Sequence, residues 1–362
     1  MRTTLVPVLS ALALSPLAVL PAHAQVVDIE DGGFTFTFGG QINRGLLRTD
    51  DGVESNDFFV DNDNSSTRLR ARGAYDFGNF VVGAQIEYEF EFSSSNSVSQ
   101  LNSDISSSVS NERKFEVFAE TRFGDFAYGQ GDTASNGVSE VDLSGTGLGN
   151  NSDVGLIAGS HLLRDAAGNL TDAEIGDFFS NFDGNSRLER FRYDTPEFFG
   201  GFVASASIGE DDSNDIALRY SGTFGDFQVR AATAFAETET RDRLSGSVSA
   251  LHEPTGFNVT FATGTDDLDA STREPGFNYV KVGYQTDAIM QAGTTSFSID
   301  YYDGQDQSEV GSNSESVSLF AVQEVDRWNT EFYAGYRTYE VSTTSTEYQD
   351  LDAVLIGARY QF

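Results

Sequence analysis

The sequence predicts an all-β fold, a transmembrane antiparallel up-and-down β-barrel of about 16 strands with a long, inward-folded third loop. Segments of about ten residues or more alternate apolar and polar side chains, the two-residue period of a strand with two different faces. Tight turns that contain Gly alternate with long polar stretches. After residue 24, no segment approaches the roughly 18 consecutive apolar residues that a membrane helix requires. The 30 Phe residues, in a chain that is only 39% hydrophobic, are then expected to face lipid.

The first 24 residues have the composition of a secretory signal peptide. Arg2 supplies a positive charge, residues 5–20 are largely apolar but interrupted by prolines, and Ala22-His23-Ala24 offers a small-x-small cleavage site. A buried N-terminal helix is the alternative. We expect residues 1–24 to be cleaved, which leaves residues 25–362 as a single exported barrel domain.

Charge and composition exclude several classes of protein. The chain has 56 Asp and Glu against 22 Lys and Arg, whereas phosphate binding requires a basic surface, so no nucleic acid is expected as a partner. The lack of cysteine excludes a disulfide scaffold and a cysteine nucleophile. A barrel enzyme is an alternative, but no Gly-x-Ser-x-Gly motif is present and only His161 and His252 follow residue 24. We therefore predict a protein that is not an enzyme.

The alternation is clearest over residues 80–92. Phe80, Ile86 and Phe92 lie on one face of an extended strand, and Glu87 and Glu89 lie on the other. We place strands near residues 34–48, 65–77, 80–92, 114–123, 126–131, 187–195, 199–210, 214–224, 227–238, 242–253, 256–265, 277–286, 294–303, 315–325, 328–341 and 350–362. This number is even, so both ends of the barrel chain are expected on the same side of the membrane.

The connections between these strands are of two kinds. Residues 77–80, 123–126 and 224–227 repeat a Phe-Gly-Asn/Asp-Phe turn, in which Gly supplies the backbone angles of a tight hairpin and the Phe residues suit an aromatic girdle. Long polar stretches, such as residues 93–111 and 342–349, lie between them. Short turns on one side and long loops on the other are typical of outer-membrane barrels. The irregular spacing argues against a β-solenoid.

One connection, residues 132–186, is much longer than the others. It contains a single base, Arg164, and several apolar pairs that can pack against other parts of the chain. Its acidic residues are Asp132, Glu140, Asp142, Asp153, Asp165, Asp172, Glu174, Asp177 and Asp183. Connections of this length are usually functional or disordered. We predict that this loop folds into the barrel and narrows its lumen, and a disordered external loop is the alternative.

Three segments and the chain end carry a family resemblance. Residues 36–45 (Phe-Thr-Phe-Gly-Gly-Gln-Ile-Asn-Arg-Gly), 61–70 (Asp-Asn-Asp-Asn-Ser-Ser-Thr-Arg-Leu-Arg) and 192–198 (Arg-Tyr-Asp-Thr-Pro-Glu-Phe) resemble strands of the general diffusion porins of Gram-negative bacteria, particularly the alphaproteobacterial type. The resemblance implies a trimeric, water-filled, 16-stranded channel whose third loop folds into the pore. It also implies that the last strand, with Tyr360 and the terminal Phe362, is the signal recognised by the barrel-assembly machinery.

Alternation also assigns basic residues to the lumen. Because Leu69, Ala71 and Tyr75 are expected to face lipid, Arg68, Arg70 and Arg72 should face inward, since an arginine on the lipid face near the midplane costs roughly 2 to 4 kcal/mol. Further inward basic residues are Lys114, Arg122, Arg190, Arg192, Arg219, Arg230, Arg337 and Arg359. Opposite the acidic loop, they would set up a transverse field that selects ions. Alternatively, they pair with lumen carboxylates such as Glu87, Glu89, Glu116 and Glu120 and form a structural wall.

Together these features predict an outer-membrane porin that lets small hydrophilic solutes and ions diffuse passively. A weak cation preference is expected because acids greatly exceed bases. The alternative is a substrate-specific channel, for example for sugars, since inward aromatic faces could stack on a sugar ring. The aromatic candidates are Tyr279, Tyr302, Phe320, Tyr333 and Tyr339. A soluble secreted all-β protein is the remaining alternative class.

No cofactor is predicted, with loosely bound calcium as an alternative. Residues 61–65 partly resemble a calcium-binding loop but lack its Gly at position 6 and its Glu at position 12, so a turn with side-chain caps is the favoured interpretation. Acidic pairs such as Asp50–Asp51 and Asp211–Asp212 lie near predicted loop ends, where divalent cations could bridge the protein and lipopolysaccharide. The expected partners are therefore outer-membrane lipid and lipopolysaccharide, and the resemblance implies further copies of the chain in a homotrimer.

Overall fold

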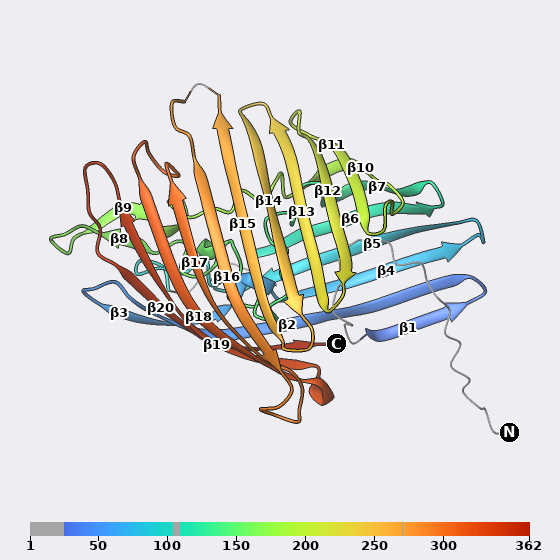
Figure 1. Cartoon of the computed structure of the whole chain (residues 1–362), viewed down its shortest axis with the longest axis horizontal. Helices are drawn as coiled ribbons and strands as arrows, with labels where there is room; N and C mark the ends of the chain where they lie inside the picture. The colour runs from blue at the N-terminus through green and yellow to red at the C-terminus, as the bar shows by residue number, and fades with distance from the viewer. Residues whose placement is uncertain (1–24, 104–108, 270) are drawn as a thin grey trace.

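The computed structural model of the chain describes residues 25–103, 109–269 and 271–362. The expected signal peptide, residues 1–24, lies outside the described residues. Within the described residues, eighteen strands form one sheet with antiparallel pairings between neighbours, and two more form a separate hairpin. The large sheet closes on itself because the first long strand pairs with the last one. The predicted all-β barrel is therefore confirmed (Figure 1).

The strands of the barrel are β2 (Phe34–Asp50), β3 (Ser55–Asp61), β4 (Arg68–Asp76), β5 (Phe80–Glu91), β6 (Val109–Thr121), β7 (Gly124–Asp132), β10 (Arg187–Asp194), β11 (Phe202–Gly209), β12 (Asn214–Phe224), β13 (Phe227–Thr238), β14 (Arg241–His252), β15 (Phe257–Leu268), β16 (Gly276–Thr286), β17 (Thr295–Gln305), β18 (Asn313–Val325), β19 (Thr330–Ser342) and β20 (Leu351–Gln361). Each of the predicted strands overlaps one of them. β3 and β4 lie end to end along the same edge of β2, so sixteen strands surround the lumen.

Within the described residues of the large sheet, two strands were not predicted. β1 (Gln25–Asp31) pairs with the first part of β2 and lies end to end with β20, whose neighbour Phe362 exchanges two backbone hydrogen bonds with Gly40. β3 lies between two of the predicted strands, in a segment to which no strand was assigned, and it contains two adjacent phenylalanines. In the structure Phe58 is buried inside the barrel and Phe59 is 80% exposed outside it, so the strand alternates after all.

The two faces of the barrel wall differ as the alternation predicts. On β5, Phe80, Val82 and Ile86 are exposed on the outer surface, whereas Glu87 and Glu89 are buried inside. An apolar exterior and a polar interior are the reverse of a soluble sheet protein and match a wall that faces lipid. In the described part of the chain, no helix has the length and apolar character needed to cross a membrane.

The tight turns lie at one end of the barrel, and Gly allows their backbone angles. Gly78 in the β4–β5 turn has φ 84° and Gly225 in the β12–β13 turn has φ 59°, both in the left-handed region that glycine tolerates. Phe77, Phe123 and Phe224 beside such turns are exposed. These side chains therefore suit the predicted aromatic girdle at one membrane interface.

The connection between β7 and β10 has its own structure inside the barrel. It contains η2 (Val154–Leu156), the hairpin of β8 (Leu162–Arg164) and β9 (Leu170–Glu174), and η3 (Ile175–Asp177). Two other short helices, η1 (Asp63–Ser65) and η4 (Asp326–Trp328), lie between barrel strands. The main apolar core lies between this connection and the inner wall, where it joins Val154, Ile157 and Phe179 to side chains of β16–β20.

Candidate functional site

The long connection follows the inner wall of the barrel. We call residues 133–186 the inner loop. The backbone N–H of Ala134 donates to Ser207 on β11, that of Val141 to Ser247 on β14, and the Thr146 hydroxyl bonds Ser298 on β17 at 2.7 Å. Successive loop residues thus contact successive strands. The returning half contacts the wall again, since the Tyr302 hydroxyl of β17 donates to the Ser180 carbonyl at 2.8 Å. The inner loop is therefore ordered and lies within the barrel.

The β8–β9 hairpin holds the tip of this loop near the β2–β3 turn (Figure 1). Arg164, the single base of the segment, pairs with Asp51 and Glu54, each at 2.9 Å. The buried imidazole of His161 bonds Thr49 through Nε2 at 3.0 Å and packs edge-on against Phe58. Burial lowers the pKa of His161 to about 4, so the imidazole is neutral at physiological pH.

The predicted arginines of β4 lie on the lumen side, and each contacts a carboxylate. Arg68 lies 3.6 Å from Glu87, and Arg70 donates from Nε to the same carboxylate at 2.6 Å. Arg72 pairs with Glu120 and stacks over the ring of Phe118. Of the two interpretations of these arginines, pairing along the wall accounts for their geometry.

A β-bulge adds a basic residue that simple alternation misses. The register of β5 and β6 shifts between Glu87 and Tyr88, so Arg113 is an extra residue beside Lys114. Arg113 donates to Glu87 at 2.8 Å and also pairs with Glu89, while Lys114 pairs with Asp132. Both side chains therefore join Arg68, Arg70 and Arg72 and the carboxylates that these residues contact, a group that we call the charged wall. Strict alternation would send either Arg113 or Lys114 to the lipid face.

The other predicted basic residues lie in different surroundings. Arg190 pairs with Glu116, Arg192 with Asp194 at 2.8 Å, and Arg359 with Glu331 at 2.6 Å, all inside the barrel. The prediction for Arg122 is corrected by the structure. Arg122 lies beyond the last residue of β6, in the turn before β7, where it is exposed and its guanidinium lies 4.5 Å from the centre of the Phe123 ring. It is outside the charged wall because the strand ends before it.

The remaining inward arginines do not line one continuous surface. Arg219 donates to the carbonyl of Asn136 in the inner loop at 2.8 Å. Arg337 is buried and pairs with Asp300 at 2.9 Å. Lys281 was not among the predicted residues, although alternation places it inside because its neighbours Val280 and Val282 face outward. Its ammonium group pairs with the Asp142 carboxylate at 2.9 Å.

The acids of the inner loop separate into two groups rather than one acidic face. Asp165, Asp172, Glu174 and Asp177 lie on or next to the β8–β9 hairpin at the end of the barrel. There, the carboxylates of Glu174 and Asp177 cap η3 and that of Asp165 accepts backbone bonds of its own turn. Glu140, Asp142, Asp153 and Asp183 belong to the segments along the inner wall. Only this second group can act on the lumen.

The protonation of the second group is unusual. The enclosed position of Asp153, together with the carboxylates of Asp63 and Asp183, raises its pKa to about 7. Glu140 has an exposed side chain, but its position inside the barrel, together with the nearby Asp183 and Asp153, also raises its pKa. The enclosed position of Asp183 raises the pKa of that carboxyl as well. For Asp142, burial alone would raise the pKa, but Lys281 and Ser144 lower it below its usual value. Asp153, with a pKa of about 7, and Glu140, with a pKa of about 8, therefore carry a fractional charge near neutral pH.

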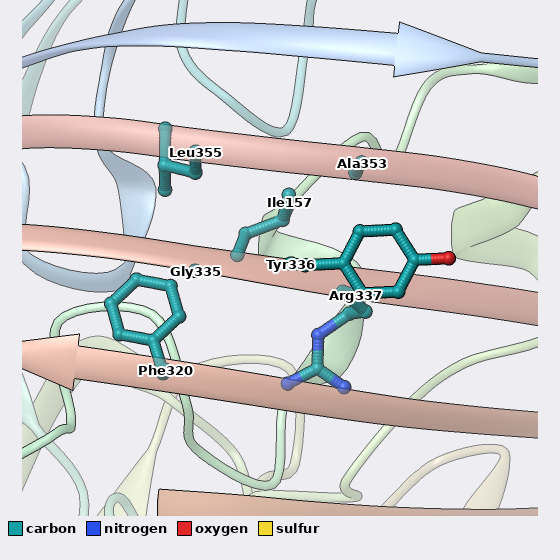
Figure 2. A pocket seen from close by; sticks show the side chains of 7 residues that line it. All are labelled: Ile157, Phe320, Gly335, Tyr336, Arg337, Ala353 and Leu355. Atoms are coloured by element: carbon teal, nitrogen blue, oxygen red, sulfur yellow. The ribbon is translucent and has the colours of Figure 1, made fainter. Parts of the chain in front are cut away.

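The inward aromatic residues are covered by the loop. Tyr279, Tyr302, Phe320, Tyr333 and Tyr339 face inward as expected, but each is at most 3% exposed. The Tyr339 hydroxyl donates to the Val154 carbonyl at 2.8 Å. Figure 2 shows Ile157 of the loop among side chains of β18, β19 and β20, close to Phe320 and Leu355. These rings hold the loop and offer no open face to a sugar.

The segment that partly resembles a calcium loop forms a capped turn. The Asn62 side chain accepts from the backbone N–H of Asn64 at 3.1 Å and caps η1, as the favoured interpretation predicts. Asp63, Glu89 and Glu91 bring carboxylate oxygens within 4.8 Å of one another, the group in the described residues that could hold a metal ion. Asp63 comes from η1 and the two glutamates from β5, so the sequence gives no signal for this group.

Comparisons with known proteins agree with this architecture. A family model described as Gram-negative porin matches residues 9–344. Similar solved structures include OmpT, an outer membrane protein of Vibrio cholerae, with a TM-score of 0.61 and 15% identity over 92% of this chain and 99% of that chain. The anion-selective porin from Comamonas acidovorans has a TM-score of 0.59 and 16% identity over 91% and 100% of the two chains. OmpF of Salmonella typhi in complex with daunomycin has a TM-score of 0.58 and 14% identity over 93% and 100%.

At these identities the solved structures support the fold alone, and no significant relative is found among curated proteins. The alphaproteobacterial type is not distinguished by these matches and stays a prediction. The family match, by contrast, spans most of the chain, and both family and fold point to an outer-membrane channel rather than an enzyme. The chain belongs to the Gram-negative porin family.

Proposed function

We propose that this channel conducts small hydrophilic solutes and ions by passive diffusion and that residues 132–186 constrict it. The observation that carries the proposal is the position of the inner loop, which covers the inner faces of β14 and of β16–β19 and leaves the charged wall of β4–β7 on the other side. The water path then runs between the loop and that wall. A path of this kind admits solutes according to their size and charge.

A weak cation preference is the proposed selectivity. The basic residues of the wall are offset by the carboxylates that they contact, so the wall has little surplus positive charge. Among the charged groups near Glu140, the carboxylates of Asp183 and Asp153 have a larger electrostatic effect on it than any cation. The loop side of the lumen therefore has a surplus of negative charge. Negative charge along a pore raises the local cation concentration.

The test is a reversal-potential and conductance measurement on the purified protein in planar bilayers. Ohmic, water-filled channels that reverse at a cation-preferring potential in a KCl gradient are expected. An anion-preferring potential would contradict the selectivity, and the absence of channels from correctly folded protein would contradict the proposed function itself.

A substrate-specific channel is the second candidate, and the covered aromatic residues argue against its sugar-selective form. Liposome-swelling rates separate the two. Rates that fall smoothly with solute size, without saturation, support general diffusion, whereas saturable flux of one sugar would support the specific channel.

We further infer a homotrimer in the outer membrane. Arg44 is partly exposed on the outer face of β2, between the exposed Ile42 and Leu46, and its guanidinium lies 3.6 Å from the carboxylate of the buried Asp61. Contact of an arginine with lipid near the midplane would cost about 2 to 4 kcal/mol. A protein partner on this face would remove that cost, and a solved form of the similar OmpT of Vibrio cholerae is a trimer. The molar mass of the detergent-extracted protein tests this. An Arg44→Glu variant should yield monomers, and a wild-type monomer would refute the trimer.

Export and assembly complete the proposal. Residues 1–24 act as a cleaved signal peptide, and the last strand with Tyr360 and Phe362 serves as the assembly signal. N-terminal sequencing of the outer-membrane form should begin at Gln25. Divalent cations that bridge lipopolysaccharide to the acidic loop ends should raise the thermal stability of the protein in native membranes. A thermal stability that stays the same after a chelator is added would count against such cations.

A further inference from the structure

A buried polar cluster joins the middle of the inner loop to four barrel strands. Its centre is Asn150, whose side chain is fully buried. The amide nitrogen Nδ2 donates to Ser298 Oγ on β17 at 2.7 Å. The amide oxygen Oδ1 accepts from Ser318 Oγ on β18 at 3.0 Å, from Arg337 Nη2 on β19 at 3.2 Å and, more weakly, from Tyr279 Oη on β16 at 3.4 Å. One loop side chain thus bonds four adjacent strands.

The main chain of Asn150 adds a charged contact. Its carbonyl accepts from Lys281 Nζ on β16 at 2.5 Å, and the same ammonium group pairs with Asp142 earlier in the loop at 2.9 Å. Lys281 is fully buried. A buried ammonium requires acceptors around it, so the loop backbone is held against β16 wherever this group remains charged.

The neighbouring residues allow this close approach. Gly149 packs against the ring of Phe320, and any Cβ at this position would overlap the ring. On the other side, Asn151 is only partly buried and donates to the Asn64 side chain near η1 at 3.1 Å. The position of the loop therefore depends on Asn150 much more than on the chemically identical residue next to it.

We propose that Asn150 is the positioning residue of the constriction, the group that fixes the inner loop against the β16–β19 wall and so sets the width of the pore. This inference rests on the proposed function of the loop. Without the Asn150 amide, Arg337 and Ser318 lose an acceptor and Ser298 loses a donor. Because an unpaired buried polar group is unfavourable, the loop is expected to separate from the wall and admit water there.

The experiment measures loop displacement and pore width separately in the full-length protein. The chain has no cysteine, so an Ala353→Cys substitution on β20 introduces a single thiol that the loop covers beside Ile157. A charged thiosulfonate reagent should label this thiol slowly in the otherwise wild-type protein and much faster when Asn150→Ala is added. Asn151→Ala is the matched control and should leave the labelling slow.

Asn150→Ala should raise the single-channel conductance in planar bilayers and raise the solute-size cut-off in liposome swelling, whereas Asn151→Ala should do neither. Heat-modifiable migration on a gel establishes that each variant is a folded barrel. If Asn150→Ala does not fold, Ser298→Ala removes the partner of Nδ2 from the barrel side and is judged by the same two measurements. Labelling and conductance that stay at wild-type values in the folded variant overturn the inference. Failure of the wild type to conduct overturns the proposed function instead, and the labelling result still decides whether Asn150 positions the loop.

Discussion

The cation preference that we propose for the channel should increase with pH across the neutral range. Asp153, Glu140 and Asp183 on the inner loop all have raised pKa values. An acid with a raised pKa is neutral below that value and negative above it, so the loop side of the lumen gains negative charge as pH rises. The protonated group also favours the folded state, so this contribution to stability is lost as pH rises through about 7.

The expected size of the effect follows from these shifts. A carboxyl with a pKa of about 7, such as that of Asp153, is about 10% ionised at pH 6 and about 90% ionised at pH 8. The neighbouring Glu140 has a pKa of about 8 and interacts with Asp153, which spreads proton loss over a wider range. The constriction should therefore gain roughly one to two negative charges between about pH 6 and pH 8.5. Ordinary carboxyls, with pKa values near 4, are ionised throughout this range.

The assay is the reversal potential in a fixed KCl gradient, measured at several pH values between about 5.5 and 8.5. Asp153→Asn and Glu140→Gln should each flatten the dependence, and the double variant should nearly remove it. Asp172→Asn, an exposed position on β9 at the end of the barrel, is the control and should keep the wild-type slope. A wild-type potential that is constant with pH, or that moves toward anions as pH rises, would refute the reasoning.

Other perturbations test separate parts of the structure. Arg337→Met leaves Asp300 buried without its cation and should cost about 3 to 5 kcal/mol, seen as a lower urea midpoint, with recovery when Asp300→Asn is added. Arg113→Gln removes the cation that pairs with Glu89 and should shift the reversal potential toward cations; an opposite shift would count against the charged wall. Deletion of Phe362 removes the two backbone bonds to Gly40 and should reduce the heat-modifiable fraction in the outer membrane. Because burial lowers the pKa of His161 to about 4, stability should fall as pH drops from about 6.5 to 4, and His161→Gln should weaken this dependence.

Alternation made most of the barrel predictable because lipid and water impose opposite demands on successive side chains. It placed Arg68 and Arg70 inside and Phe80 and Ile86 outside without any tertiary information. It failed where the backbone breaks the period. The bulge at Arg113 adds a residue to one strand only, and its position depends on the partner strand, which a single sequence does not specify.

The path of the inner loop was not predictable for a different reason. Asn150 lies in a run of Gly, Asn and Ser that is typical of a surface loop, and its role comes from four strands that lie more than a hundred residues later in the chain. Likewise, Tyr279 and Tyr339 were correctly placed inside, but alternation alone cannot tell whether an inward ring meets solute or loop. Only the covered positions of these rings decide between the two.

The net charge of -34 is a poor guide to the field inside this channel. Many acids lie on the hairpin, in turns or in ion pairs with wall arginines, where they contribute little to the lumen. The ions that pass the constriction instead meet a few loop carboxyls whose protonation is set by their mutual repulsion and enclosure. Selectivity should then respond to the removal of Asp153 or Glu140 far more strongly than to the removal of the same number of acids from the β8–β9 hairpin. If the proposed function is correct, the position of the charge, rather than its total, sets the selectivity of this pore.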